Sequence, residues 1–147
     1  MIKKNPIILI INNMNTLKAV IECLENNYSA YIQDLDGVVA TGSTITEIKA
    51  NLIEAVNVFI ESCKEHNCKI PYQLKGDFTI TFSMDVKTLL SIYGNVFTKS
   101  GLERLTGINQ KQLWHYANGV STPRRTQAMK IENALHRLGH ELIAVEL

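Results

Sequence analysis

The hydrophobic residues of this 147-residue chain change their spacing near Met84, and this change constrains the fold more than any other feature. Before Met84, several segments alternate between apolar and polar residues, as half-buried strands do. After Met84, apolar residues recur every three or four positions, as on one face of a helix. We therefore expect a sheet-containing domain followed by a helical one. A composition of 46% hydrophobic and 20% charged residues suffices for a buried core.

The residues before Met84 predict the element order β-β-β-α-β. Thr44 and Glu47 have the spacing of a capping box, and the apolar residues from Ile45 to Cys63 form one helical stripe that is expected to cover a sheet face. Strands are expected at Leu17–Leu24, Tyr28–Ile32, Val38–Ala40 and Phe78–Phe82. Of these, Tyr28–Ile32 and Phe78–Phe82 are candidate borders of the sheet.

Four helices are expected after Met84, each with a residue suited to cap its start. They are Val86–Tyr93 after Asp85, Thr98–Thr106, a helix from Asn109 to Gly119, and a last helix that Thr122 caps, Pro123 begins and Gly139 ends. The apolar residues of Glu141–Leu147 predict a short terminal strand, which packs on the domain or pairs with another subunit.

Lys99–Gly119 has the pattern of a helix-turn-helix. That motif needs a buried Leu on its first helix, Gly at the turn, an apolar residue after it, and two apolar anchors on the second helix. Those positions hold Leu102, Gly107, Ile108, Leu113 and Tyr116. Residues 85–140 resemble phage-repressor-like (Xre/Cro-type) helix-turn-helix domains. Glu103 stands where such motifs usually have Ala or Gly, so its side chain must extend outward or loosen the helix crossing.

Burial of Leu113 and Tyr116 would leave Gln110, Lys111, Trp114 and His115 on the outward face of the second helix. Gln suits an adenine edge, Lys a guanine or a phosphate, and Trp a thymine methyl group. The competing interpretation is that Trp114 packs on a neighbouring helix and that the polar side chains are only solvated. The predicted DNA-binding residues are Asn109, Gln110, Lys111, Trp114, His115, Arg124 and Arg125.

Arg124 and Arg125 lie at a helix start, where cations oppose the helix dipole. A phosphate at that place would be attracted by the free N–H groups and by both guanidinium groups. The alternative is that solvent screens both arginines. Lys99, Lys111 and Lys130 can extend the same surface. Residues 98–147 carry 7 Lys+Arg and 4 Asp+Glu, whereas residues 1–97 carry 8 and 10, so the basic surplus is C-terminal.

A second resemblance covers residues 14–83. The aromatic strand Tyr28–Ile32, the turn Asp34–Gly37, the exit Gly42–Thr44 and the capped helix after it closely resemble the HicB family of antitoxins. The sequence departs from the family pattern at Asp36, where Pro is frequent, and at Lys49-Ala50. The resemblance implies a partial RNase H-like fold, a C-terminal DNA-binding unit and repression of the protein's own operon. It also implies a HicA-type toxin as partner, a small ribonuclease with a double-stranded-RNA-binding fold.

Together these observations predict an α+β protein: an N-terminal extension (residues 1–13), a HicB-like toxin-binding domain (14–84) and an all-α helix-turn-helix DNA-binding domain (85–147). A homodimer or a higher even-numbered oligomer is expected, because its two-fold symmetry matches a palindromic operator. The alternative is a stand-alone transcriptional regulator whose N-terminal domain senses a small molecule or only dimerises.

No enzymatic activity, metal or cofactor is expected. Cys63, His66 and Cys68 have poor spacing for zinc. The carboxylates available for metal-dependent cleavage are few, and nothing in the sequence makes them converge: Glu22, Glu25, Asp34, Asp36 and Asp77.

The cysteine content and the hydropathy predict a cytoplasmic protein without a membrane partner. Three cysteines are too few, and odd in number, for a disulfide framework. The longest apolar run, Ile7–Ile11, is far shorter than the roughly 20 residues of a membrane-spanning helix.

Overall fold

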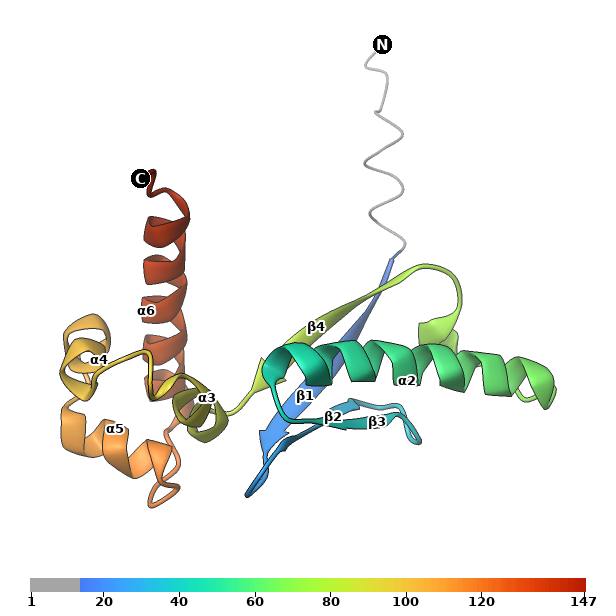
Figure 1. Ribbon diagram of the computed structural model, residues 1–147, viewed down its shortest axis with the longest axis horizontal. Coiled ribbons are helices and arrows are strands. Elements are labelled where there is room, and N and C mark those ends of the chain that lie inside the picture. Colours follow the sequence, from blue (N-terminus) through green and yellow to red (C-terminus); the bar gives the residue numbers. More distant parts are fainter. Residues whose placement is uncertain (1–13) are drawn as a thin grey trace, which may run out of the picture. The chain divides into compact units, whose positions relative to one another are not determined.

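A computed structural model describes residues 14–147 of the chain (Figure 1). The chain divides after Met84 into two compact units, the second of which is Asp85–Leu147. The described residues form one four-stranded mixed sheet and five α-helices, so the predicted α+β class is confirmed. The run Ile7–Ile11 and the rest of the predicted extension, residues 1–13, lie outside the described residues.

The sheet of the first unit has the strand order β3-β2-β1-β4. The strands are β1 (Asn15–Cys23), β2 (Tyr28–Ile32), β3 (Val39–Gly42) and β4 (Phe78–Met84). β2 pairs antiparallel with both β1 and β3, whereas β4 pairs parallel with β1. The border prediction is therefore correct for Phe78–Phe82 and wrong for Tyr28–Ile32. β2 is internal because β3, which extends to Gly42, pairs with its second edge.

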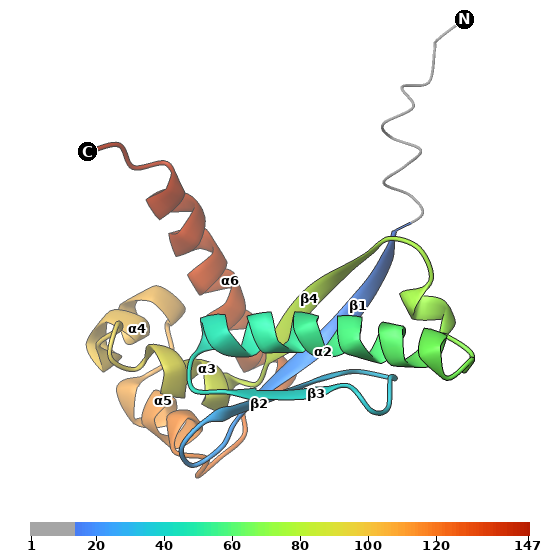
Figure 2. The same ribbon diagram turned by 45° about the vertical axis from the view of Figure 1, so that its right-hand side comes forward.

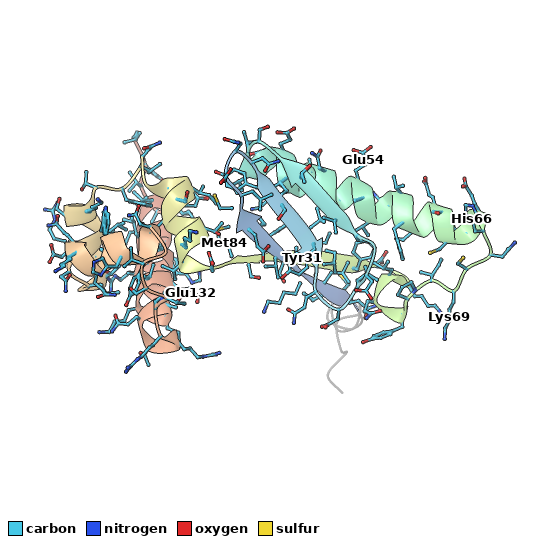
Figure 3. The ribbon with its side chains drawn as sticks, turned by 90° about the horizontal axis from the view of Figure 1, so that it is seen from below. Tyr31, Glu54, His66, Lys69, Met84 and Glu132 are labelled. Atoms are coloured by element: carbon cyan, nitrogen blue, oxygen red, sulfur yellow. The ribbon has the colours of Figure 1, made fainter. Side chains whose placement is uncertain are left out.

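Helix α2 (Ile45–Glu65) makes the crossover that a parallel pair requires, and it covers one face of the sheet (Figure 2). Its start follows the predicted capping box: Thr44 Oγ1 accepts from the Glu47 N–H at 3.1 Å, and a Glu47 carboxylate oxygen accepts from the Ser43 N–H at 2.8 Å. Glu54 lies on the outward side of α2 (Figure 3). Its buried side packs on the apolar face of the sheet; the fully buried residues of this core include Ala19, Ile21, Ala30, Ile48, Leu52 and Val56.

Gly42 determines how closely α2 approaches the sheet. A Cβ atom at this position would lie 2.8 Å from the backbone N of Ile48 and 3.0 Å from its Cα, which is too close for any side chain. The last residue of β3 and the first turn of α2 are therefore in contact through backbone atoms.

The second unit consists of α3 (Val86–Tyr93), α4 (Lys99–Thr106), α5 (Gln110–Ala117) and α6 (Arg125–Ile143). The predicted caps Asp85 and Asn109 are confirmed, and Thr98, predicted as the first residue of its helix, caps α4 in the same way. The side chains of Asp85, Thr98 and Asn109 each accept a hydrogen bond from the backbone N–H three residues later, at 2.7, 3.0 and 2.8 Å. None of the described helices is both long enough and apolar enough to span a membrane.

The predicted bounds of the last helix were wrong at both ends. Arg124, not Thr122, is the N-cap, and Pro123 precedes the helix. The N–H groups of Gln127 and Ala128 both bond to the Arg124 carbonyl, whereas Pro123 favours an extended Thr122 before it. α6 then continues through Gly139 to Ile143, so no strand forms at Glu141–Leu147.

The close contact at Gly42 predicts opposite effects for two Gly→Ala substitutions. Gly42→Ala should lower the free energy of unfolding by about 1–3 kcal/mol, because Ile48 backbone atoms must move. Gly139→Ala should raise it by about 0.5–1 kcal/mol, because this Gly is inside a helix and a Cβ there meets nothing within 4 Å. Urea unfolding followed by circular dichroism measures both. A destabilised Gly139→Ala variant would contradict the continuous helix.

Candidate nucleic-acid interface

The second unit packs around the helix pair α4–α5. Leu102 of α4, Ile108 of the turn, and Leu113 and Tyr116 of α5 are buried in one cluster with Leu90 of α3 and Ile131 of α6. Gly107 ends α4 with φ 73°, in the left-handed region that favours Gly. These burials hold α5 in a fixed orientation against three other helices.

Thr106 stabilises the turn between α4 and α5 with one buried hydroxyl group. Its Oγ1 donates to the Leu102 carbonyl at 2.7 Å and accepts from the Ile108 N–H at 3.1 Å. The first backbone N–H after the left-handed Gly is thereby satisfied inside the core. This role of Thr106 was not predicted, although a hydroxyl residue directly before a turn Gly is a recognisable signal.

The outward side of α5 carries the side chains that were predicted to face DNA. Gln110, Lys111 and Trp114 are exposed, and His115 is half-buried. Trp114 is 43% exposed and lies edge-on to His115, with the two ring centroids 5.6 Å apart. Trp114 therefore contacts its neighbour on α5 and does not join the buried cluster.

Glu103 extends outward across the turn. Its Oε2 accepts a hydrogen bond from Gln110 Nε2 at 2.8 Å. This contact orients the Gln110 side chain, whose carbonyl oxygen and second amide hydrogen are left for a base edge. The sequence left open whether the Glu103 side chain extends outward or loosens the crossing of the two helices, and in the structure it extends outward.

A surface depression of about 460 Å³ lies between the start of α5 and the start of α6. Its only charged lining residues among those described are Arg124 and Lys130, both cationic, and it also brings Asn109 beside them. The side-chain oxygen of Asn109 is occupied by its capping hydrogen bond. A phosphate placed here would meet two cations near two helix starts.

The depression gathers only part of the predicted site. Gln110, Lys111, Trp114, His115 and Arg125 do not line it. The polar lining residues that were not predicted as part of the site include Gln112 and Ser121, which share a hydrogen bond of 3.1 Å, and also Thr122 and Gln127. Their convergence depends on the crossing of α5 and α6, which no local sequence pattern reports.

Arg124 and Arg125 are both exposed at the start of α6, and Arg124 makes no capping hydrogen bond with its side chain. The first turn of α6 contains no acidic residue. The unfavourable placement of two cations beside a helix N-terminus, inferred from the sequence, is thus present, with α6 beginning at Arg125.

Charge is divided unevenly between the two units. Residues 85–147 carry eight Lys+Arg and five Asp+Glu, whereas residues 14–84 carry five and nine. The first described unit is therefore acidic and the second is basic.

The described residues form no group of three or more His, Cys, Asp or Glu that could hold a metal ion. Glu22 is exposed on β1, Asp34 and Asp36 lie in the loop before β3, and Asp77 immediately precedes β4. Cys63 is a buried free thiol and Cys68 is an exposed one.

Comparisons of the chain with protein-family models, with the curated proteins and with solved structures found no match.

The hydroxyl of Thr106 should matter more than its size. Thr106→Val keeps the shape but leaves the Ile108 N–H without its partner, so it should lower the free energy of unfolding by about 1–3 kcal/mol. The control is Thr126→Val in the first turn of α6, where the side chain is exposed and the change should be within about 0.5 kcal/mol. If the two substitutions lowered the free energy of unfolding equally in urea, the buried hydroxyl of Thr106 would not stabilise the fold more than an exposed one.

Proposed function

We propose that this protein is the antitoxin of a HicAB-like toxin–antitoxin system, which neutralises a HicA-type mRNA-cleaving toxin and represses its own operon by binding operator DNA. In this proposal the second unit is a helix-turn-helix domain whose recognition helix is α5. The observation that carries the DNA-binding part is the exposed row on α5 beside a depression lined by two cations.

The dimensions and chemistry of α5 suit a major groove. Eight residues of helix span about 12 Å, comparable to the groove's width of roughly 12 Å. Gln110, held by Glu103, and Lys111 offer hydrogen-bond donors to base edges. Arg124 and Lys130 would then contact backbone phosphates, which set the position of the helix but read no sequence.

The antitoxin part of the proposal rests on the family resemblance of residues 14–83, supported by two features of the first unit. Its element order is β-β-β-α-β, which is the order that the resemblance implies for a partial RNase H-like domain. Its acidic surplus suits a basic, RNA-binding partner, because opposite charges accelerate and orient association. No catalytic residue, metal or cofactor is needed for either activity.

One observation favours the alternative of a free-standing regulator that senses a small molecule. A groove of about 610 Å³ in the first unit has apolar walls, formed among others by Ile60, Ile70, Leu74 and Phe78. Charges of both signs also line it, from Glu61, Lys64 and Lys75. A small molecule with an apolar body and polar groups would fit this chemistry. DNA release by such a ligand, without any protein partner, would support the alternative.

DNA binding is tested with a fragment of the protein's own promoter region. Lys111→Ala and Arg124→Ala should each weaken binding, because each removes one contact to DNA. Arg124→Ala should also reduce the slope of log K against log salt concentration by about 1, because the lost contact is to a phosphate. Lys69→Ala is the matched control, an exposed Lys of the first unit (Figure 3), and should change neither quantity. Unchanged binding in both α5–α6 variants would remove the helix-turn-helix part of the proposal.

Toxin neutralisation is tested by co-expression with the small open reading frame beside the gene. Growth arrest by that neighbour alone, rescue by this protein and a stable purified complex are the expected results. Lys111→Ala should still rescue growth, because toxin binding is assigned to the first unit. Absence of both toxicity and complex would favour the free-standing regulator.

A further inference from the structure

Strand β4 forms one border of the sheet, and its sequence does nothing to discourage pairing. It has seven residues, Phe78–Met84, with neither a charge nor a Pro among them. Sheet borders in natural proteins usually carry charges, prolines or bulges, or are short or covered, because an open edge is a template for another strand. Among the described elements, only β1 pairs with β4.

The opposite border is protected in the expected way. β3 has only four residues, Val39–Gly42. The side chain of Asn51, on α2, donates a hydrogen bond of 2.8 Å to the Thr41 carbonyl and so covers a backbone acceptor of this strand. The two borders of the same sheet therefore differ, and within residues 14–147 only β4 is a long and uncovered one.

The apolar side of β4 is also incompletely buried. Phe78, Ile80, Phe82 and Met84 alternate along the face that α2 covers elsewhere, and all four are half-buried. On β1, the neighbouring strand, Leu17, Ala19 and Ile21 are at most 3% exposed. Helix α2 packs mainly on β2 and β3, and Lys49 reaches the border with its Nζ 4.9 Å from the Phe82 ring centroid.

We propose that β4 pairs antiparallel with β4 of a second copy of this chain, about a two-fold axis at Thr81, to form a continuous eight-stranded sheet. This register places Thr81 opposite the partner's Thr81, Ile80 opposite the partner's Phe82, and Phe78 opposite the partner's Met84. Directly opposite residues share a face of the sheet, so apolar side chains meet apolar ones and hydroxyl side chains meet hydroxyl ones. A shift of this register by one residue would place the apolar side chains of one strand on the same face as the hydroxyl side chains of the other.

The absence of charge on β4 favours a second copy over a basic partner. β4 offers no carboxylate to a cationic protein, whereas two uncharged strands pair without repulsion. Seven residues extend about 23 Å. A contact between two edges of this length is small beside the roughly 1,000 Å² or more that specific interfaces bury. The dimer should therefore dissociate on dilution.

This interface lies wholly within the first unit and does not depend on the proposed function, since neither DNA nor a toxin takes part. Thr81 is exposed, so a charged side chain at this position can extend into solvent, although its substitution removes the hydrogen bond to the Leu17 carbonyl. In a two-fold pair, Thr81→Lys places two ammonium groups opposite each other. Thr79→Lys places each ammonium opposite the partner's Ser83 and should be less disruptive.

Sedimentation equilibrium of the full chain over a range of concentrations tests the proposal. Thr81→Lys and Thr81→Glu should each raise the dissociation constant of this association about fivefold or more, and Thr79→Lys by less. A mixture of the Thr81→Lys and Thr81→Glu variants should regain association as a heterodimer, because opposite charges then face each other. Thr41→Lys, on β3 at the protected border, is the matched control and should associate as the unmodified chain does. Circular dichroism establishes that each variant is folded.

Three results would overturn the proposal. One is an unmodified chain that stays monomeric at every concentration. Another is a folded Thr81→Lys variant with unchanged mass, or one that charge complementation does not restore. The third is a Thr81→Lys variant that loses only its complex with a protein partner, which would make β4 the edge for that partner.

Discussion

The parallel pairing of β1 with β4 is the constraint on which the rest of the first unit depends. Thr81 Oγ1 and Ser83 Oγ reinforce it by donating to the carbonyls of Leu17 and Ala19, each 64 positions earlier in the chain. Parallel neighbours cannot be joined by a hairpin, so the chain needs a crossover, and the 21 residues of α2 provide most of it. The crossover begins where Gly42 allows backbone contact with Ile48, and it ends with β4 at the border of the sheet.

Local signals in the sequence were reliable where the residue and its partner lie within one turn of each other. The capping residues Asp85 and Asn109 and the strictly alternating strand Phe78–Phe82 are of this kind. The order of the strands in the sheet could not be predicted from local signals, because no pattern inside Tyr28–Ile32 indicates that β3 pairs with its second edge. The predicted end of the last helix was wrong because Gly139 is locally a helix-ending signal. The apolar spacing of Ile131, Leu135, Leu138 and Leu142 nevertheless continues past it.

In the candidate interface, too, the features set by local sequence were predictable and the contacts between separate elements were not. Helical periodicity sufficed to predict that Leu113 and Tyr116 are buried and that Gln110, Lys111 and Trp114 are exposed. Periodicity says nothing about contacts across a turn or between helices. The hydrogen bond from Gln110 to Glu103, and the meeting of Asn109, Arg124 and Lys130 around one depression, depend on how α5 crosses its neighbours. A residue that broke the expected motif, Glu103, became the support of its first outward-facing side chain.

The same β1–β4 pairing has a consequence while the chain is being made. β1 acquires its parallel neighbour only after some 60 further residues have been synthesised, which takes about 3–12 s at 5–20 residues per second. During that interval β1, β2 and β3 can form their hairpins, but the uncharged stretch Ala19–Ile21 of β1 presents an unpaired edge. The nascent protein is thus most prone to association with other chains just before Met84 emerges, whereas the second unit, whose helices make mainly local contacts, adds little further delay.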